Sequence, residues 1–130
     1  MISHIHIGVA DLERAWRFYS SVLPHLGLKV RFYEPERGWG GWQAPDRTRP
    51  LFLIGRPFDG APAHCGNGHM TAFLAPDRSS VDRAYAAALA AGGVSEGAPG
   101  LRPQYHANYY GAYFRDLDGN KLGVCCHDPA

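Results

Sequence analysis

The first nine residues of the chain alternate between apolar and polar side chains. Ile5, Ile7 and Val9 fall on one side of an extended segment. His4 and His6 fall on the other side. Because the side chains of a β-strand alternate between its two faces, this pattern predicts a strand with one apolar face.

A helix is predicted directly after this strand. Asp11 is a suitable N-cap, because its side-chain oxygen can accept a hydrogen bond from the first turn. The apolar residues that follow are spaced by three and four positions, which places them on one face of a helix. They are Leu12, Ala15, Trp16, Tyr19 and Leu23. We expect Pro24 and Gly27 to end the helix.

Three further strand candidates complete the first half of the chain. Residues 28–33 alternate again, residues 38–42 are rich in glycine and tryptophan, and residues 51–54 form a short apolar run. From residue 56 to residue 68 the composition changes to Pro, Gly, Ala and Asp without periodicity. This segment is therefore predicted to be a connector.

The second half repeats this order of elements. Residues 69–74 are strand-like, and Asp77, or one of the serines after it, can cap a helix that ends at Gly92-Gly93. Residues 109–115 and 121–127 are strand candidates, and the Asp-Gly pair between them favours a hairpin turn.

The spacing of the two halves predicts an internal duplication. His4 and His69 each precede a capped helix and lie 65 positions apart, which is half of the 130-residue chain. We therefore expect two βαβββ modules, the first at about 1–58 and the second at about 68–130, joined by a connector at about 59–67.

Composition favours a single globular domain that acts on small molecules. The chain is 45% hydrophobic and 19% charged, with a formal net charge of +1. Nucleic acids and anionic membranes require clustered Lys and Arg, so we expect neither as a partner. No apolar run approaches the roughly 18 residues of a membrane span. Three cysteines fit free thiols better than a disulfide framework, and without a signal-peptide pattern a cytoplasmic location is expected.

Two segments carry a family resemblance. Residues 4–12 (HIHIGVADL), followed by Phe18-Tyr19, and the closing residues 115–122 (RDLDGNKL) resemble the vicinal-oxygen-chelate superfamily, which includes glyoxalase I, bleomycin-resistance proteins and extradiol dioxygenases. The resemblance implies an α+β fold of two tandem βαβββ modules that form a cupped mixed sheet, assembled as a homodimer. Leu117 stands where that superfamily usually has proline, and Asp118-Gly119 remain to form the turn.

The resemblance also implies a metal site with two ligand positions in each module. His4 and His69 match the two first-strand positions, where a divalent Zn, Ni, Mn or Fe ion is expected. The last-strand positions, usually glutamate, fall near residues 52–54 and at Gly123, and neither offers a ligand. The candidates that share a face with these positions are His6, Cys125 and His127. The alternative is that the two histidines line a cup without metal.

One loop combines the groups that a small-molecule pocket needs. Arg102, Tyr105, His106 and Tyr109 fall within residues 101–110, and aromatic rings with a few polar atoms are typical of ligand pockets. His106 is the best general acid or base, because its unperturbed pKa lies near neutrality. Trp39 and Trp42 form either a second wall of this pocket or a dimer contact. The other interpretation is that the tyrosines only pack on the sheet edge.

The family resemblance, taken together with these residues, implies three candidate functions. The leading one is a glyoxalase-like lyase or isomerase, in which a metal at His4 and His69 polarises substrate oxygens and His106 or a metal-bound water moves a proton. The alternative is a metal-free binding protein of the bleomycin-resistance type, which Gly123 favours. The third is an extradiol dioxygenase, which lacks its carboxylate ligand here.

Overall fold

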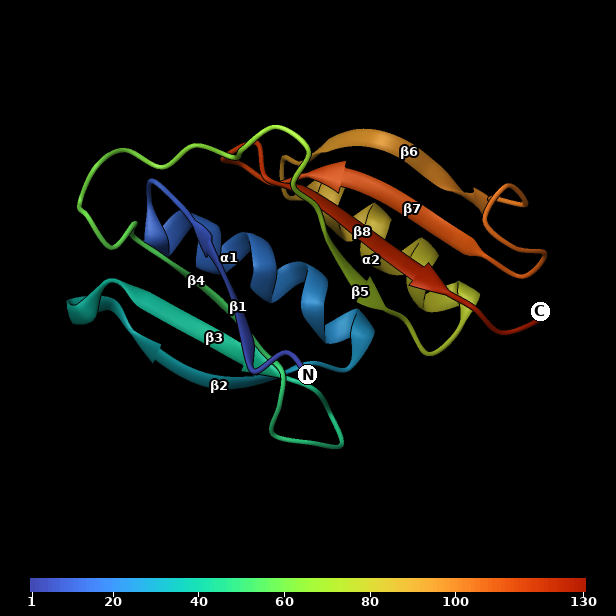
Figure 1. Ribbon diagram of the computed structural model, residues 1–130, viewed down its shortest axis with the longest axis horizontal. Helices are drawn as coiled ribbons and strands as arrows, with labels where there is room; N and C mark the ends of the chain where they lie inside the picture. Colours follow the sequence, from blue (N-terminus) through green and yellow to red (C-terminus); the bar gives the residue numbers. More distant parts are fainter.

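Each half of the chain folds into a βαβββ module, and the computed structural model describes residues 1–130 (Figure 1). The first module contains β1 (His4–Gly8), α1 (Leu12–Val22), β2 (Lys29–Glu34), β3 (Trp39–Gln43) and β4 (Leu51–Gly55). The second contains β5 (Thr71–Leu74), α2 (Arg78–Ala90), β6 (Val94–Leu101), β7 (Tyr110–Arg115) and β8 (Lys121–Cys126). Short 3₁₀ helices at Leu23–Leu26 and Pro35–Arg37 follow α1 and β2. The predicted fold class, α+β with two mixed sheets, is confirmed.

The two sheets have the same strand order. They run β1-β4-β3-β2 and β5-β8-β7-β6. In each sheet the first strand pairs in parallel with the last strand of its own module, and the other pairings are antiparallel. β1 and β5 are therefore edge strands, each with one hydrogen-bonding side free. In Figure 1 these two strands lie apart near the middle of the molecule, with α1 visible between them.

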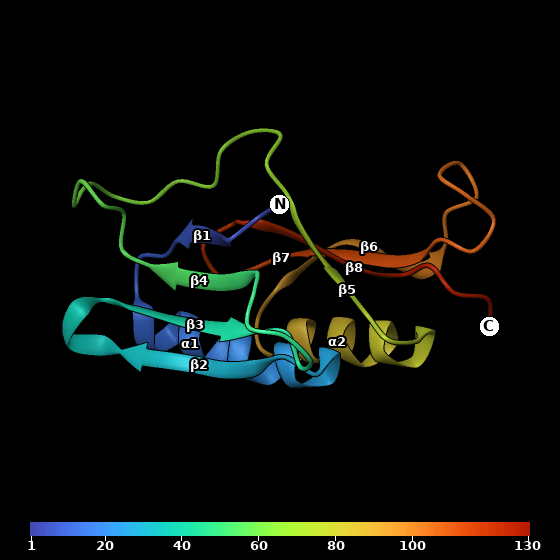
Figure 2. The same ribbon diagram turned by 60° about the horizontal axis from the view of Figure 1, so that its bottom comes forward.

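Both helices begin at the predicted caps. The Asp11 carboxylate accepts a hydrogen bond from the backbone N–H of Arg14 at 3.1 Å, and Asp77 accepts one from Ser80 at 2.7 Å. These bonds satisfy N–H groups that a helix leaves unpaired at its start. The helices pack against each other and against the sheets, on the lower side of the molecule in Figure 2.

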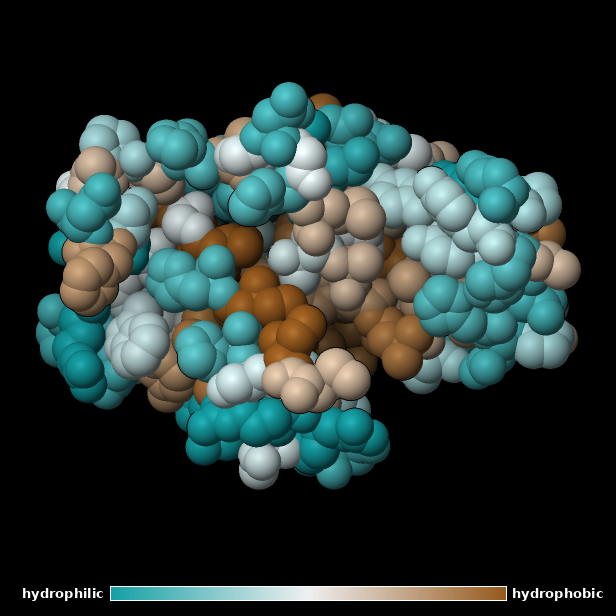
Figure 3. All heavy atoms as spheres, viewed as in Figure 1, coloured by the Kyte–Doolittle hydropathy of each residue, from teal (hydrophilic) through white to brown (hydrophobic).

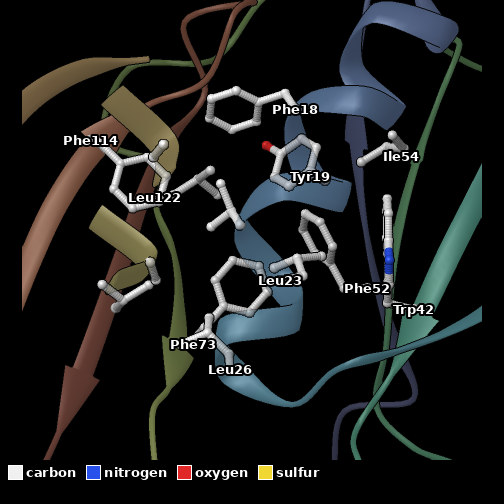
Figure 4. Packing of buried hydrophobic residues seen from close by; sticks show 14 of the residues in the cluster. Phe18, Tyr19, Leu23, Leu26, Trp42, Phe52, Ile54, Phe73, Phe114 and Leu122 are labelled. Atoms are coloured by element: carbon white, nitrogen blue, oxygen red, sulfur yellow. The ribbon is translucent and has the colours of Figure 1, made fainter. Parts of the chain in front are cut away.

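The hydrophobic core is shared between the modules. Figure 4 shows α1 in the middle, with Trp42 and Phe52 of the first sheet on one side and Phe73 and Phe114 of the second sheet on the other. All four rings are at least nine-tenths buried. The Phe52 and Phe73 rings meet edge to face, with centroids 4.9 Å apart. The modules therefore form one core, and the face of each sheet that points away from it is called the open face below.

The hairpin between β7 and β8 fastens the second module to the first. Asp116 is buried and accepts a hydrogen bond from the Tyr19 hydroxyl of α1 at 2.6 Å. Asp118 accepts a bond from the backbone N–H of Ala10 at 2.9 Å, and the Asn120 amide donates to the Gly8 carbonyl at 3.1 Å. The Asp-Leu-Asp-Gly-Asn motif thus forms the predicted turn and also joins two parts of the chain about a hundred residues apart.

One strand of the second module has no alternating pattern in the sequence, although the βαβββ repeat requires it. β6 contains two glycines and a proline, and its pairing with β7 shifts register between Ser95 and Gly97 and again between Gly97 and Gly100.

Neither helix is long and apolar enough to cross a membrane.

Candidate functional site

A cleft opens between the edge strands β1 and β5. Its volume is about 780 Å³, within the range of about 300–1,000 Å³ that is typical of small-molecule sites. Ile5 and Leu51 contribute from the first sheet, and Ala72, Phe73 and Leu74 from the second. Figure 3 shows this region as a hollow lined by apolar residues in the middle of the surface. We call it the inter-module cleft.

The polar groups of the cleft lie on its rim. Asp46 and Arg47 come from the loop before β4, and His127 and Asp128 follow β8. Because β8 pairs in parallel with β5, the residues after β8 lie beside the end of β5 at the cleft. His127 is therefore the histidine that lines the cleft.

His106 stands behind His127 rather than in the cleft lining. Its Nε2 lies 2.8 Å from His127 Nδ1, so one ring donates a hydrogen bond to the other. The ring also packs edge-on against Tyr109, with centroids 5.6 Å apart. The structure thus brings the predicted acid or base into contact with a second imidazole, which can pass a proton to or from the cleft.

Two tyrosines cover the open face of the second sheet beside this histidine pair. The Tyr109 and Tyr113 hydroxyls are 2.9 Å apart and hydrogen-bonded. A Cβ at Gly123 would lie 3.2 Å from the Tyr113 ring, and a Cβ at Gly111 would lie 2.9 Å from the Tyr109 ring. The glycines therefore leave the space that the two rings occupy. Tyr113 was not predicted, and its signal was its place on the same strand face as Tyr109 and Gly111.

Burial keeps both the Tyr109 hydroxyl and the Cys125 thiol protonated. It raises the pKa of Tyr109, and the hydrogen bond to Tyr113 and the nearby Cys125 thiol raise it further. Burial also raises the pKa of the Cys125 thiol, whose sulfur lies 3.7 Å from His127 Nε2. At neutral pH both groups are protonated, so Cys125 is a thiol rather than a thiolate nucleophile.

Cations flank Tyr113. The Arg102 guanidinium lies 5.6 Å from the ring centroid and the Lys121 ammonium 5.8 Å from it. The Arg102 side chain also donates to the Ala98 carbonyl at 2.8 Å. Tyr105 is exposed and packs on Tyr109 at 4.9 Å between centroids. Of the predicted loop residues, Arg102 thus reaches Tyr113 on the open face, while Tyr105, His106 and Tyr109 form one aromatic cluster.

The predicted metal-binding histidines occupy different environments. His4 is on the open face of β1, and its Nδ1 lies 3.0 Å from the Ser3 hydroxyl. His69 precedes β5, packs against Gly66, and lines a small hollow of about 200 Å³ with His6. Burial lowers the pKa of His6, and the neighbouring His4 lowers it further.

The helix caps correct the offset between the modules. Asp11 and Asp77 are 66 positions apart rather than 65, so the residue that corresponds to His4 is Met70. A shift of one residue in a strand turns a side chain to the opposite face. His69 is therefore one position away from the place that the duplication assigns to a first-strand ligand.

The two tryptophans lie on opposite faces of β3. Trp42 is 1% exposed and stacks on Trp16 in the core at 4.2 Å between centroids. Trp39 is half-buried on the open face, where its Nε1 donates to Glu34 at 2.7 Å. Residues three positions apart in a strand point in opposite directions. Only Trp39 is therefore available as the wall of a binding site.

The chain is similar to known proteins in both sequence and fold. A family model described as the Glyoxalase/Bleomycin resistance protein/Dioxygenase superfamily matches residues 1–124. A glyoxalase/bleomycin resistance protein from Albidiferax ferrireducens T118 is 35% identical, with a TM-score of 0.87 over 97% of this chain and 98% of that one. No curated protein matches.

More distant structures share the fold. A glyoxalase/bleomycin resistance protein/dioxygenase family enzyme from Burkholderia phytofirmans PsJN is 21% identical, with a TM-score of 0.71 over 97% of this chain and 98% of that one. TioX from Micromonospora sp. ML1 is 17% identical, with a TM-score of 0.66 over 98% and 99%. With the match over residues 1–124 and the 35% identity across nearly the whole chain, the protein belongs to the glyoxalase/bleomycin resistance protein/dioxygenase superfamily.

Proposed function

We propose that this protein binds a small, largely apolar molecule in the inter-module cleft, without a metal ion held at the superfamily's ligand positions. The observation that carries the proposal is the cleft itself, which combines a volume of about 780 Å³ and mostly apolar walls with His127 at the rim. Sites of this kind gain affinity from apolar burial and orient the ligand through a few polar groups.

The side chains at the four expected ligand positions do not fit a divalent metal. The His4 imidazole could coordinate a metal, but the residues on the open face of β4 include Leu51 and Leu53, which offer no ligand atom. The second module presents Met70 at the position equivalent to His4, and Gly123 lies under the Tyr113 ring. Zinc and related ions take three or four protein ligands in such sites. A second copy of the chain would supply the same residues, so this holds for a dimer as well.

The metal-dependent lyase and the extradiol dioxygenase rest on the same ligand set. Within one chain, no group of three His, Cys, Asp or Glu side chains lies close enough together to hold a metal ion. We therefore expect no isomerisation of the hemithioacetal of methylglyoxal and glutathione, with or without added zinc or nickel. Turnover that depends on His4 would contradict this proposal.

The histidine pair supports a second candidate, metal-free proton transfer on the bound molecule. His127 lines the cleft and His106 hydrogen-bonds to it at 2.8 Å, so His106 would position His127 as the group that touches a ligand. This candidate requires the same cleft, and it predicts that His127→Ala abolishes turnover of a substrate while leaving the protein folded.

A neutral fluorescent probe tests the cleft directly. N-phenyl-1-naphthylamine becomes strongly fluorescent in apolar sites, and we expect saturable binding. Ala72→Phe places a ring in the cleft, whereas Ala86→Phe makes the same change on the exposed face of α2. We expect the first variant to raise the dissociation constant at least about tenfold and the second to leave it unchanged. Equal affinity in both variants would refute the proposal.

The superfamily resemblance also predicts a homodimer and a cytoplasmic location, and both stay predictions. The mass of the protein in solution, measured by light scattering, separates a ligand cleft from an assembly surface. If Ala72→Phe converts a dimer into a monomer and Ala86→Phe does not, the cleft belongs to the dimer interface. If the mass is unchanged while probe binding is lost, the cleft is a ligand site.

A further inference from the structure

A second hollow lies near the carboxyl end of β1, away from the inter-module cleft. Its volume is about 700 Å³. The walls come from β1, the turn before β3 and the connector that follows β4. The side chains that matter here are His6, Arg37, Trp39, Arg56, Phe58 and His64. The proposed function does not use this hollow.

Two arginines line the hollow, and Arg56 is the one whose charge is not paired. Arg37 lies 3.6 Å from the Glu34 carboxylate and 5.7 Å from the Trp39 ring centroid, so it is already partnered. Asp59 is the acidic residue of the lining, and its carboxylate accepts a hydrogen bond from the Ala61 backbone at 2.9 Å. Arg56 has neither an ion-pair partner nor a side-chain hydrogen bond within the chain.

The backbone of the turn holds the stem of Arg56 in place. A Cβ at Gly38 would lie 3.2 Å from Arg56 Cδ and 3.4 Å from its Nε. The Arg56 backbone N–H also donates to the Gly38 carbonyl at 3.1 Å. Glycine at position 38 thus allows the arginine to lie across the turn. Its guanidinium offers a planar set of N–H donors that match the geometry of a carboxylate or phosphate.

An apolar ring stands at the rim of the same hollow. Phe58 is fully exposed, although most large hydrophobic residues of the chain are packed. Pro57 and Pro62 extend this apolar surface. A free guanidinium beside an unpacked ring is complementary to a molecule that has one anionic group and an apolar body.

We infer that this hollow is a second binding site, for a small organic oxyanion such as an aromatic carboxylate or a phosphate monoester. Arg56 pairs with the anionic group, and Phe58 covers the apolar body. A carboxylate and a phosphate share this chemistry, so the two are separated by experiment.

Backbone amide NMR shifts of the whole chain test this site. The probes are sodium benzoate, phenyl phosphate and inorganic phosphate, each at constant ionic strength with chloride as the reference anion. We expect saturable shifts at residues 37–39 and 55–64. Tighter binding of benzoate than of phenyl phosphate would assign a carboxylate ligand, and the reverse order would assign a phosphate monoester.

Two variants and a matched control identify the charge partner. Arg56→Gln should raise the dissociation constant of the tighter probe at least about tenfold, because hydrogen bonds to charged groups contribute on this scale. Arg56→Lys should raise it less, because the charge remains. Arg17→Gln removes an equal charge from the exposed side of α1 and should leave the dissociation constant unchanged. No shifts beyond those with chloride, or equal effects of Arg56→Gln and Arg17→Gln, would overturn the inference.

The inter-module cleft and this hollow can be tested independently of each other. Arg56→Gln should leave the affinity for N-phenyl-1-naphthylamine unchanged, and Ala72→Phe should leave benzoate binding unchanged. If one substitution weakens both probes equally, the hollow is not a separate site.

Discussion

Replacing Tyr19 by phenylalanine tests the link between the two modules. The Tyr19 ring is fully buried, and its hydroxyl donates to Asp116 at 2.6 Å. Asp116 also accepts bonds from the backbone N–H groups of Asp118 and Asn120 and from the Asn120 amide, each at 2.9 Å. Tyr19→Phe leaves the ring packing intact and removes one of four bonds to a buried carboxylate.

The expected loss in unfolding free energy is about 1.5–3 kcal/mol, the scale of a hydrogen bond to a charged group. For a chain of this length it corresponds to a fall in Tm of roughly 5–10 °C. Tyr110→Phe is the matched control, since the Tyr110 hydroxyl donates to Asp82 at the same 2.6 Å but at the surface. Solvent replaces that bond, so we expect a loss below about 1 kcal/mol.

Urea denaturation followed by far-ultraviolet circular dichroism measures both losses. The dependence of the unfolding free energy on urea should be the same in both variants, because neither exposes new surface in the native state. A loss for Tyr19→Phe that is no larger than that for Tyr110→Phe would refute the idea that this hairpin fastens the modules together.

Two further predictions concern the same fold. Burial raises the pKa of the Asp118 carboxyl, so the stability that this group contributes is present below about pH 3.9 and is lost as the pH rises through its higher folded pKa. Asp118→Asn should therefore gain stability relative to the parent protein from about pH 4 towards neutrality, measured by urea denaturation. A difference in urea midpoints that does not change with pH would contradict this. In Gly40→Ala the new Cβ would lie 2.6 Å from Trp16, which is stacked between Tyr33 and Trp42 and cannot move aside. We therefore expect a loss of about 1–3 kcal/mol of unfolding free energy in urea denaturation, together with a changed near-ultraviolet circular dichroism spectrum. An unchanged stability would show that the stacked rings can shift to accommodate the methyl group.

The sequence was sufficient for the elements that have a local signature. The alternation at β1, the caps Asp11 and Asp77, and the Asp-Gly turn before β8 each depend on a few neighbouring residues. β6 has no such signature, because its glycines and proline give no alternation and its two register shifts depend on β7. β6 is a strand because it pairs with β7.

The candidate site was less predictable because it depends on contacts between distant segments. The cleft lies between β1 and β5, the edge strands of two separate sheets, and no local sequence pattern predicts the space between two edges. His106 could be picked out by type, but its contact with His127 depends on how the loop before β7 folds over the end of β8. The opposite orientations of Trp39 and Trp42, in contrast, follow from their spacing of three within one strand.

The dissociation constant of N-phenyl-1-naphthylamine, measured on one preparation before and after dialysis against EDTA, tests most directly whether the cleft binds a ligand without metal. We predict the same dissociation constant within about twofold before and after dialysis. The cleft walls are apolar, and of the superfamily's four ligand positions one carries His4 while the other three carry Leu, Met and Gly. An affinity that falls at least about tenfold on dialysis, and returns with one equivalent of zinc in the parent protein but not in His4→Ala, would contradict the proposal.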